Sequence, residues 1–330
     1  NLKLKDRPPF KGFLPDGRTL YDMNSVGADP NDRWRERGYR EVIELTNTDK
    51  GKNEQYTIQL DRPMKNNFAW RIGYTYSRNK TVADGTSRNA YTNWASNVGF
   101  DPNSDILGLS SFNTPHRIVA SFTYNLKWSS RHSTRFTVVY DGRVGRPYSY
   151  MGDLNVDMNG DGNDDNDLLY VPSGLDDPLV AWGNRNNNLD EAEAFMAWID
   201  TVDGLKSFKG QVVPRNTGTS PWIHQVDLNI THTIKTWENQ KLELILNIQN
   251  IGNLIDEGWG REKRPRGGYG KFVNVLTQGT HSPRNNVFVE GNEYGHFRYG
   301  FEEITERSLY FHPQGLSSRW AAQIGLRYSF

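Results

Sequence analysis

The chain contains no cysteine and no apolar run long enough for a membrane-spanning helix. The missing cysteine excludes a disulfide scaffold and any thiolate metal or redox site, and a transmembrane helix needs about 20 consecutive apolar residues. Positive and negative charges balance at 39 each, so we expect neither a basic nucleic-acid surface nor an acidic tail. Apolar residues make up only 35% of the 330 positions without glycine and about 44% with it, where a water-soluble globule has about 45–50% on the count with glycine.

Aromatic residues and glycine are plentiful instead. The chain has 10 Trp, 16 Tyr and 31 Gly. Disordered chains are poor in aromatics, so disorder is not expected. The chain begins at Asn1 without a Met or a signal peptide, which indicates a mature product or a fragment. Low apolar content with many aromatic residues favours a fold built from β-strands.

Residues 320–330 alternate strictly between two kinds of side chain. Trp320, Ala322, Ile324, Leu326, Tyr328 and Phe330 share one face, and small or polar residues share the other, because side chains alternate across a strand. The segment is long enough for a tilted membrane-spanning β-strand, which needs about 9–11 residues. Its apolar face would contact lipid, with aromatic residues at both membrane interfaces.

The same alternation recurs in residues 68–77, 117–124, 135–140, 225–231 and 241–250. The residues that we predict to face lipid are Trp70, Ile72, Tyr74, Tyr76, Ile118, Phe122, Tyr124, Val226, Leu228, Ile230, Leu242, Leu244, Leu246, Trp320 and Ile324. A soluble β-sandwich alternates in the same way but places its apolar face in the core. Alternation alone therefore leaves both architectures open, although it favours the barrel.

The lengths of the connections favour the barrel further. Long and short connections alternate along the chain, as in outer-membrane barrels with long external loops and short periplasmic turns. The sequence therefore predicts an all-β fold, an antiparallel transmembrane β-barrel segment with long extracellular loops, the longest at residues 144–222. Because lipid does not tolerate open sheet edges, we expect the C-terminal part of a larger barrel.

Two stretches are harder to assign to strands. The apolar positions are odd at Ile43 and Leu45 but even at Tyr56, Ile58 and Leu60. A bulge near residues 50–51 would reconcile them within one long strand. Residues 251–318 are predicted to be external, with an extra strand pair around residues 272–276 and 308–311.

Six motifs stand in a recognisable order: NTDKG at 47–51, SFNTPHRIVAS at 111–121, GRPYS at 145–149, NGDGNDDNDLLYVP at 159–172, SRW at 318–320 and LRYSF at 326–330. In this order they resemble the C-terminal barrel half of Oar-like TonB-dependent outer-membrane receptors. The resemblance implies a 22-stranded barrel around an N-terminal plug, in a Gram-negative outer membrane, with energy supplied through TonB. It covers residues 40–330. The plug and the TonB box are not in this chain, so they would lie upstream or on another chain.

The Asp/Asn-rich tract carries the clearest chemical signal. Asp157, Asn159 and Asp161 followed by Gly162 reproduce the first half of a calcium loop, although Leu168 replaces the glutamate expected at the twelfth position. We therefore predict Ca²⁺ as a cofactor, because close carboxylates repel one another without a cation. The alternative is a solvated, turn-rich loop without metal. The candidate ligands are Asp153, Asn155, Asp157, Asn159, Asp161, Asp165 and Asp167.

Two other loop segments have alternative interpretations. Residues 189–202 predict a short amphipathic helix with Phe195, Trp198, Ile199 and Val202 on one face, either a lid over the barrel mouth or an element that packs within its loop. Residues 261–266 form a basic patch that could contact lipopolysaccharide phosphates or simply be solvated.

The remaining predictions concern function. The chain has no recognisable catalytic motif, and His116 beside Arg117 is expected to mark the start of a strand, so an enzyme is not predicted. Leu326, Tyr328 and Phe330 resemble the terminal signal read by the barrel assembly machinery. The leading hypothesis is the barrel portion of a TonB-dependent receptor or transporter with extracellular ligand-binding loops and an unknown ligand. The alternative is a secreted or surface all-β, calcium-dependent adhesin.

Overall fold

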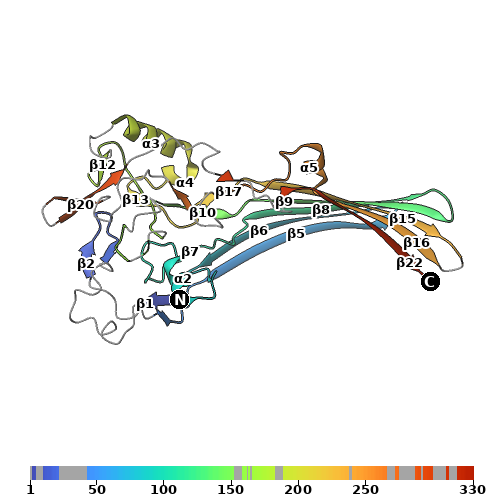
Figure 1. The fold of residues 1–330 in the computed structure, drawn as a ribbon, viewed down its shortest axis with the longest axis horizontal. Helices are drawn as coiled ribbons and strands as arrows, with labels where there is room; N and C mark the ends of the chain where they lie inside the picture. Colours follow the sequence, from blue (N-terminus) through green and yellow to red (C-terminus); the bar gives the residue numbers. More distant parts are fainter. Residues whose placement is uncertain are drawn as a thin grey trace.

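The structure is a computed structural model that describes residues 2–4, 10–21, 43–151, 158–161, 163, 166–182, 189–237, 240–265, 272–274, 287–290, 293–299, 310–311 and 318–330. It is elongated, with a long curved sheet at one end and short strands and helices at the other (Figure 1). We call the sheet the wall. We call the second part, built mainly from residues 10–21, 82–115, 144–222 and 293–299, the cap.

The wall is an antiparallel sheet in the order β22-β16-β15-β9-β8-β6-β5, with the short β7 beside β6. Each alternating segment of the sequence forms one of its strands, which confirms those predictions. The strands are β5 (Lys52–Lys65), β6 (Phe68–Thr81), β7 (Gly108–Leu109), β8 (His116–Lys127), β9 (His132–Arg143), β15 (Ile223–Lys235), β16 (Lys241–Gln249) and β22 (Ala321–Ser329).

Short and long connections lie at opposite ends of the wall. The turn between β5 and β6 consists of Asn66 and Asn67, which adopt φ of 54° and 65°, the left-handed conformation that a two-residue hairpin requires and Asn tolerates. Residues 128–131 form another short turn, and only five residues separate the end of β15 from the start of β16; both connections lie at the end of the wall near the C-terminus (Figure 1). The long connections lead into the cap, as the sequence predicted.

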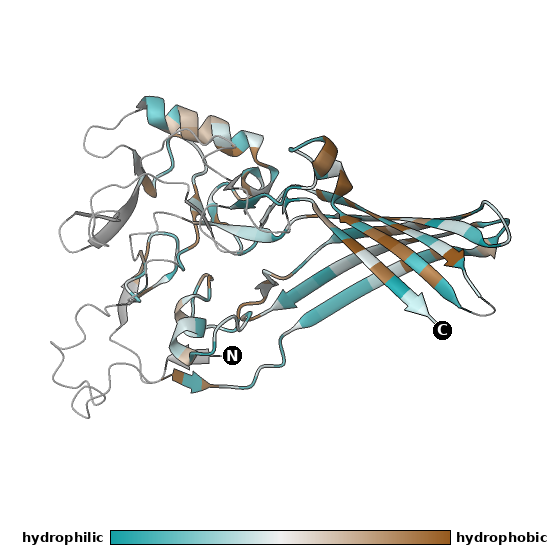
Figure 2. Cartoon of the chain, turned by 45° about the vertical axis from the view of Figure 1, so that its right-hand side comes forward, coloured by the Kyte–Doolittle hydropathy of each residue, from teal (hydrophilic) through white to brown (hydrophobic). Residues whose placement is uncertain are grey.

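The register of the wall places its apolar residues on one face. Trp70, Phe122, Val138, Leu228, Ile248 and Ala322 form one continuous row of partners, and Phe68, Tyr124, Phe136, Ile230, Leu246 and Ile324 form the next. All the residues predicted to face lipid lie at even-numbered positions of this same face, apart from Trp320, which precedes β22 and has no strand partner. Figure 2 shows the result as hydrophobic and hydrophilic bands that alternate along the strands.

Among the described residues, no protein core covers either face of the wall. Leu244 is 46% exposed, Leu326 69% and Ile324 84%. The opposite face carries charges and amides, such as Arg117, whose Nε donates to Asp141 at 2.9 Å. A sheet with one bare apolar face and one bare polar face fits lipid on one side and a watery lumen on the other.

Two strand predictions are wrong. β4 (Ile43–Leu45) does not continue into β5 through a bulge but pairs with β1 (Leu2–Leu4), and residues 46–51 form no strand. The switch of the apolar residues from odd to even positions therefore marks the boundary between two sheets, not a bulge within one strand. β18 (Phe272–Asn274) runs parallel to β10, and β21 (Tyr310–Phe311) pairs with β17 (Arg264–Pro265), so in the described part of the two segments the expected pair does not form.

The cap has a core of its own, unlike the wall. Phe195, Ile199, Leu205 and Val213 are fully buried in a cluster that also contains Tyr299. The remaining elements are β2 (Phe10–Phe13), β3 (Thr19–Tyr21), α2 (Ala90–Ala95), β10 (Pro147–Met151), β11 (Tyr170–Val171), β12 (Val180–Trp182), α3 (Leu189–Thr201), α4 (Asp203–Lys206), β13 (Gln211–Val212), β14 (Gly218–Thr219), α5 (Ile251–Ile255), β19 (Val287–Glu290) and β20 (Glu293–Tyr299). None of the described helices is long and apolar enough to cross a membrane.

The predicted amphipathic helix is confirmed as α3. Phe195 and Ile199 are buried, and Trp198 and Val202 pack against the same cluster. The apolar face of α3 is therefore occupied by the core of the cap, which supports the interpretation of a self-packing element over that of a free docking helix.

Candidate functional site

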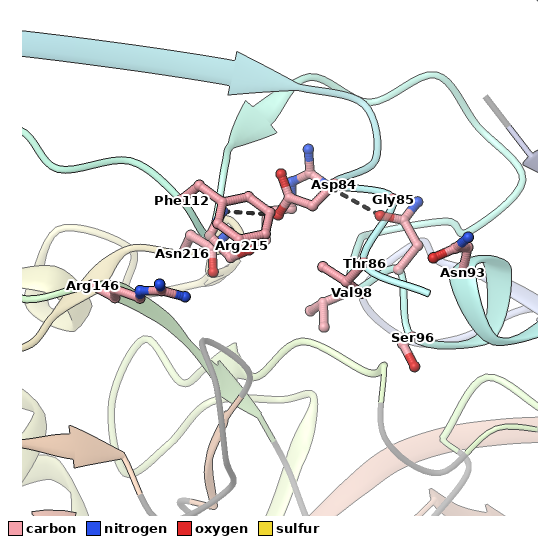
Figure 3. Close-up of a pocket in the computed structure, with 12 residues that line it drawn as sticks. Asp84, Gly85, Thr86, Asn93, Ser96, Val98, Phe112, Arg146, Arg215 and Asn216 are labelled. Atoms are coloured by element: carbon pink, nitrogen blue, oxygen red, sulfur yellow. Dashed lines mark hydrogen bonds between the residues drawn. The ribbon is translucent and has the colours of Figure 1, made fainter. Parts of the chain in front are cut away.

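A polar pocket of about 200 Å³ opens in the cap (Figure 3). Its walls carry both charges, with Arg146 and Arg215 against Asp84, together with hydroxyl and amide side chains. Phe112 is 53% exposed, and the Arg146 guanidinium lies over its ring at 5.6 Å. Such a lining suits a small polar solute that carries charged groups and a face able to pack on an aromatic ring.

Asp84 stays ionised in this pocket. Burial would raise the pKa of its carboxyl, but hydrogen bonds from Ser110, Ser111 and Thr81 outweigh burial and hold the pKa below its usual range. The backbone N–H of Ser111 donates to Oδ2 at 2.8 Å, and the Thr81 hydroxyl donates to Oδ1 at 2.9 Å. The pocket therefore presents a fixed negative charge.

Arg215 joins the segments that form the pocket. Its Nη1 donates to the Val82 carbonyl and to Asn97 Oδ1, both at 2.9 Å, and its Nη2 donates to the Thr81 carbonyl. Gly108 lies directly against this side chain, so that any Cβ there would collide with Arg215. The guanidinium thus ties the start of the loop between β6 and β8 to Asn97 within the same loop, and Gly108 leaves the room that its side chain needs.

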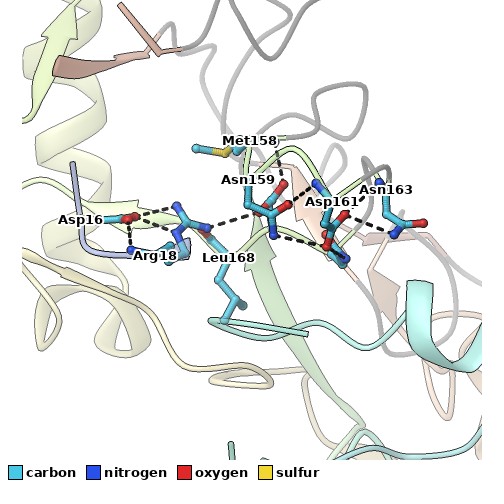
Figure 4. Close-up of polar contacts among 9 residues, drawn as sticks. Asp16, Arg18, Met158, Asn159, Asp161, Asn163 and Leu168 are labelled. Atoms are coloured by element: carbon cyan, nitrogen blue, oxygen red, sulfur yellow. Dashed lines mark hydrogen bonds and ion pairs between the residues drawn. The ribbon is translucent and has the colours of Figure 1, made fainter. Parts of the chain in front are cut away.

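A cluster of amides surrounds Asp161 in the described part of the Asp/Asn tract (Figure 4). Asn166 Nδ2 donates to Asp161 Oδ2 at 2.8 Å, and the Asn163 backbone N–H donates to Oδ1 at 2.9 Å. Asp161 and Asn159 are buried. Burial raises the pKa of Asp161, although hydrogen bonds from Asn166, Asn163 and Asn159 oppose the shift.

The structure describes only part of the predicted ligand set. Asn159, Asp161 and Asp167 are all buried within the tract. Asp153, Asn155, Asp157 and Asp165 lie outside the described residues. Within the described part of the chain, no group of three His, Asp or Glu side chains is arranged to hold a metal, so the local donors are two carboxylates and several amides.

Arg18 anchors this tract to the first loop of the cap (Figure 4). Its Nη1 donates to the Leu168 carbonyl at 2.9 Å and lies 3.6 Å from Asp167 Oδ1, while its Nη2 lies 2.7 Å from Asp16 Oδ2. Asp167 Oδ2 also accepts the backbone N–H of Met158 at 2.7 Å. The Arg18 side chain has no exposed surface, so this is a fully buried ion-pair network.

Asp177 organises the loop that follows β11. Its Oδ2 accepts the backbone N–H of Ser173 at 2.6 Å and the Tyr170 hydroxyl at 3.0 Å, and its Oδ1 accepts the backbone N–H of Leu179 at 2.8 Å. Burial alone would raise the pKa of Asp177, but these hydrogen bonds prevail and lower it. The same contact and burial raise the pKa of Tyr170.

We expect the cap to lose stability in acid through Asp177. Because its folded pKa lies below the ordinary value of 3.8, its stabilisation is complete above that pH and is lost as the pH falls through the folded pKa. Asp177→Asn should lower the free energy of unfolding at neutral pH by about 1–3 kcal/mol and flatten the acid dependence. Melting curves in detergent between pH 7 and 3 measure this. The neighbouring exposed Asp176→Asn should behave as wild type, and an unchanged acid dependence in Asp177→Asn would contradict the assignment.

Aromatic and histidine side chains gather on the apolar face near the cap. The Tyr74 hydroxyl is 2.8 Å from His116 Nδ1, and the Tyr140 hydroxyl is 2.8 Å from His224 Nδ1. Trp222 stacks on both His116 and His224. β8 begins at His116, as the sequence predicted. Amphipathic rings at this height are typical of the membrane interface.

At the opposite end of the wall, Leu326, Tyr328 and Phe330 lie on the same apolar face and are well exposed. The predicted basic patch is less positive than its sequence implies, because Arg264 Nη2 lies 2.6 Å from Glu262 Oε2. Arg266 lies outside the described residues.

Sequence reasoning missed the residues that shape the pocket and the anchor. Arg18, Asp84 and Arg215 act through contacts with backbone groups and with residues far away in the chain, which leave no local pattern. Arg146 stands in the GRPYS motif, but the motif alone shows no role. Asn163 and Asn166 belong to the Asp/Asn tract, and because their side chains carry oxygen atoms, they could have been included among the predicted metal ligands.

An antiparallel wall with one apolar and one polar face, an aromatic interface and long loops at one end defines a membrane β-barrel protein. The chain matches the family model of the outer membrane beta barrel domain over residues 17–256 and belongs to that family. It is therefore located in the outer membrane of a Gram-negative bacterium. No match was found among curated proteins or among solved structures.

Proposed function

We propose that the chain is the barrel portion of a TonB-dependent receptor, which forms the wall of the pore and the extracellular surface that binds the ligand. The observation that carries this proposal is the wall itself, whose polar face continues across all neighbouring strands. Thr123, Thr137, Asn229, Asn247 and Gln323 form one continuous row of partners on this face, so a broad hydrophilic surface is available to a plug. The motifs shared with Oar-like receptors support the same proposal.

The edges of the wall support a barrel larger than the strands described. Within the described residues, β5 and β22 each pair with one wall strand only. Lipid offers no hydrogen bonds to an open strand edge, so we infer that further strands complete the wall, up to the 22 that the resemblance implies. The free edge of β22, with Leu326, Tyr328 and Phe330 exposed, is the surface we propose for the barrel assembly machinery, by strand addition.

We propose that the cap receives the ligand, because outer-membrane barrels carry their long loops on the extracellular side. Its pocket, with Arg146 and Asp84 on its walls, is the ligand site that we propose, for transport and not for catalysis. Arg261 is exposed, and we propose that it contacts lipopolysaccharide phosphate in the outer leaflet.

Photocrosslinking from adjacent residues of β8 tests the proposed plug. Ser121 lies on the polar face and Phe122 on the apolar face. A photoreactive side chain at Ser121, in the full protein in native outer membranes, should crosslink to a plug domain, whereas the same group at Phe122 should crosslink to lipid. The products are identified by mass spectrometry.

Crosslinks to lipid from both positions, or to no protein segment from Ser121, would contradict a plugged receptor. Extraction of the protein from cells as a monomer without detergent would instead favour the surface adhesin. We expect Ser121 to crosslink to the plug in cells without TonB as well, because the contact between barrel and plug forms before energy is transferred.

A further inference from the structure

The cluster around Asp161 brings amide side chains to a single buried carboxylate. Asp161 has no exposed surface. Asn166 Nδ2 lies 2.8 Å and Asn159 Nδ2 3.3 Å from its Oδ2, and Asn163 Nδ2 lies 3.2 Å from its Oδ1. Three amide groups from different positions of the tract therefore converge on one buried carboxylate.

A second observation points to a missing ligand. Asn166 is 1% exposed, and its Oδ1 has no hydrogen-bond partner among the described residues, which costs free energy in a buried position. The nitrogen of the same amide contacts Asp161. Rotation of an amide by 180° exchanges its oxygen and nitrogen at almost no change in shape. After that rotation, two oxygens would face each other, which is stable only with a cation between them.

The chemistry of the donors selects the cation. The cluster offers a carboxylate and amide oxygens, and the chain has no cysteine, so a soft thiolate-binding metal is disfavoured. Ca²⁺ accepts six to eight oxygen ligands in flexible geometry, whereas Mg²⁺ demands a near-ideal octahedron and keeps its water. Residues 159, 161 and 163 also alternate in the manner of calcium loops.

We propose that Asp161, Asn159, Asn163 and Asn166 bind Ca²⁺ with their side-chain oxygens. The site would also fix one wall of the pocket. The Tyr91 hydroxyl donates to Asn163 Oδ1 at 3.3 Å, and it can accept from the amide nitrogen after rotation. Tyr91 belongs to α2, which also supplies Asn93 to the pocket (Figure 3). Ca²⁺ therefore holds α2 against the Asp/Asn tract.

Calcium binding is measured on the full protein extracted in detergent and freed of metal with a chelator. Ca²⁺ should raise the melting temperature of the cap, and Mg²⁺ at the same concentration should not. Tb³⁺, which occupies calcium sites, should show emission excited through Tyr91, and Ca²⁺ should compete it away. Asp161→Asn should weaken Ca²⁺ binding roughly tenfold or more, because affinity follows the charge of the ligands.

Asn166→Asp gives a signature that a purely structural amide would not. A second buried carboxylate should lower the melting temperature below wild type in chelator, yet raise Ca²⁺ affinity and restore stability when Ca²⁺ is added. Asp177→Asn, in a buried network with its own donors, is the matched control and should leave Ca²⁺ affinity unchanged. If Asp161→Asn fails to fold, the chelator comparison on wild type and the Asn166→Asp variant still decide.

Two results would overturn the proposal. The first is a melting temperature of the wild type that is the same in Ca²⁺ and in chelator. The second is Ca²⁺ affinity that neither Asp161→Asn nor Asn166→Asp changes, which would place any bound calcium elsewhere in the protein.

Discussion

Val138→Arg is expected to remove most of the assembled barrel from the outer membrane, whereas Val139→Arg leaves it largely intact. Val138 lies in the middle of β9 on the apolar face, between Phe122 and Leu228. An arginine on the lipid face near the bilayer midplane costs about 2–4 kcal/mol. On the polar face, Val139 pairs with Ser121 and Asp227, so an arginine there meets a carboxylate and water.

The two variants form a matched pair, because the same substitution is made at the same residue type, one position apart. Heat-modifiable migration of protein from outer-membrane fractions measures the folded barrel. Equal loss in both variants would show that β9 does not separate lipid from lumen. Greater loss in Val139→Arg would reverse the assignment of the two faces.

Arg18→Leu is expected to destabilise the cap by about 3–5 kcal/mol, the usual cost of removing one partner from a buried ion pair. The substitution leaves the Asp16 and Asp167 side chains, 1% and 3% exposed, without their shared cation. It also removes the donor to the Leu168 carbonyl. Hydrogen exchange of the neighbouring strand β11 should rise accordingly, because local opening becomes easier.

Lys209→Leu provides the control for this experiment. Lys209 Nζ lies 2.6 Å from Asp200 Oδ1, but the two side chains are 32% and 59% exposed. Surface pairs contribute about 0–1 kcal/mol, so exchange in β11 should stay close to wild type. An Arg18→Leu variant with wild-type exchange would mean that the buried network does not hold the cap together.

The wall was predictable from sequence because a strand between lipid and water repeats every two residues. Ile324 and Gln323 differ in parity, and parity alone assigned their faces correctly. The tight turn at Asn66 and Asn67 and the long connections also carry local signals. The sequence could not show that Ile43 belongs to another sheet, because two residues of odd parity fit a bulge as well as a separate strand.

The cap was predictable only in part, because its contacts join residues far apart in sequence. α3 was visible from its helical spacing. The contact of Arg215 with the carbonyls of Thr81 and Val82 spans more than a hundred residues and ends on backbone atoms, which every residue possesses. The sequence of the Asp/Asn tract showed many possible oxygen ligands, but it did not show that Asp161 would be buried among amide side chains.

The bare faces of the wall also constrain how the chain reaches its membrane. Each wall strand relies on lipid, not on other parts of this chain, to cover side chains such as Phe122 and Leu244, which are 40% and 46% exposed. A wall folded in water would expose these faces together and adhere to other copies. We therefore expect the polypeptide to cross the aqueous periplasm with its wall strands still unformed. The cap buries its own apolar residues and needs no bilayer to do so.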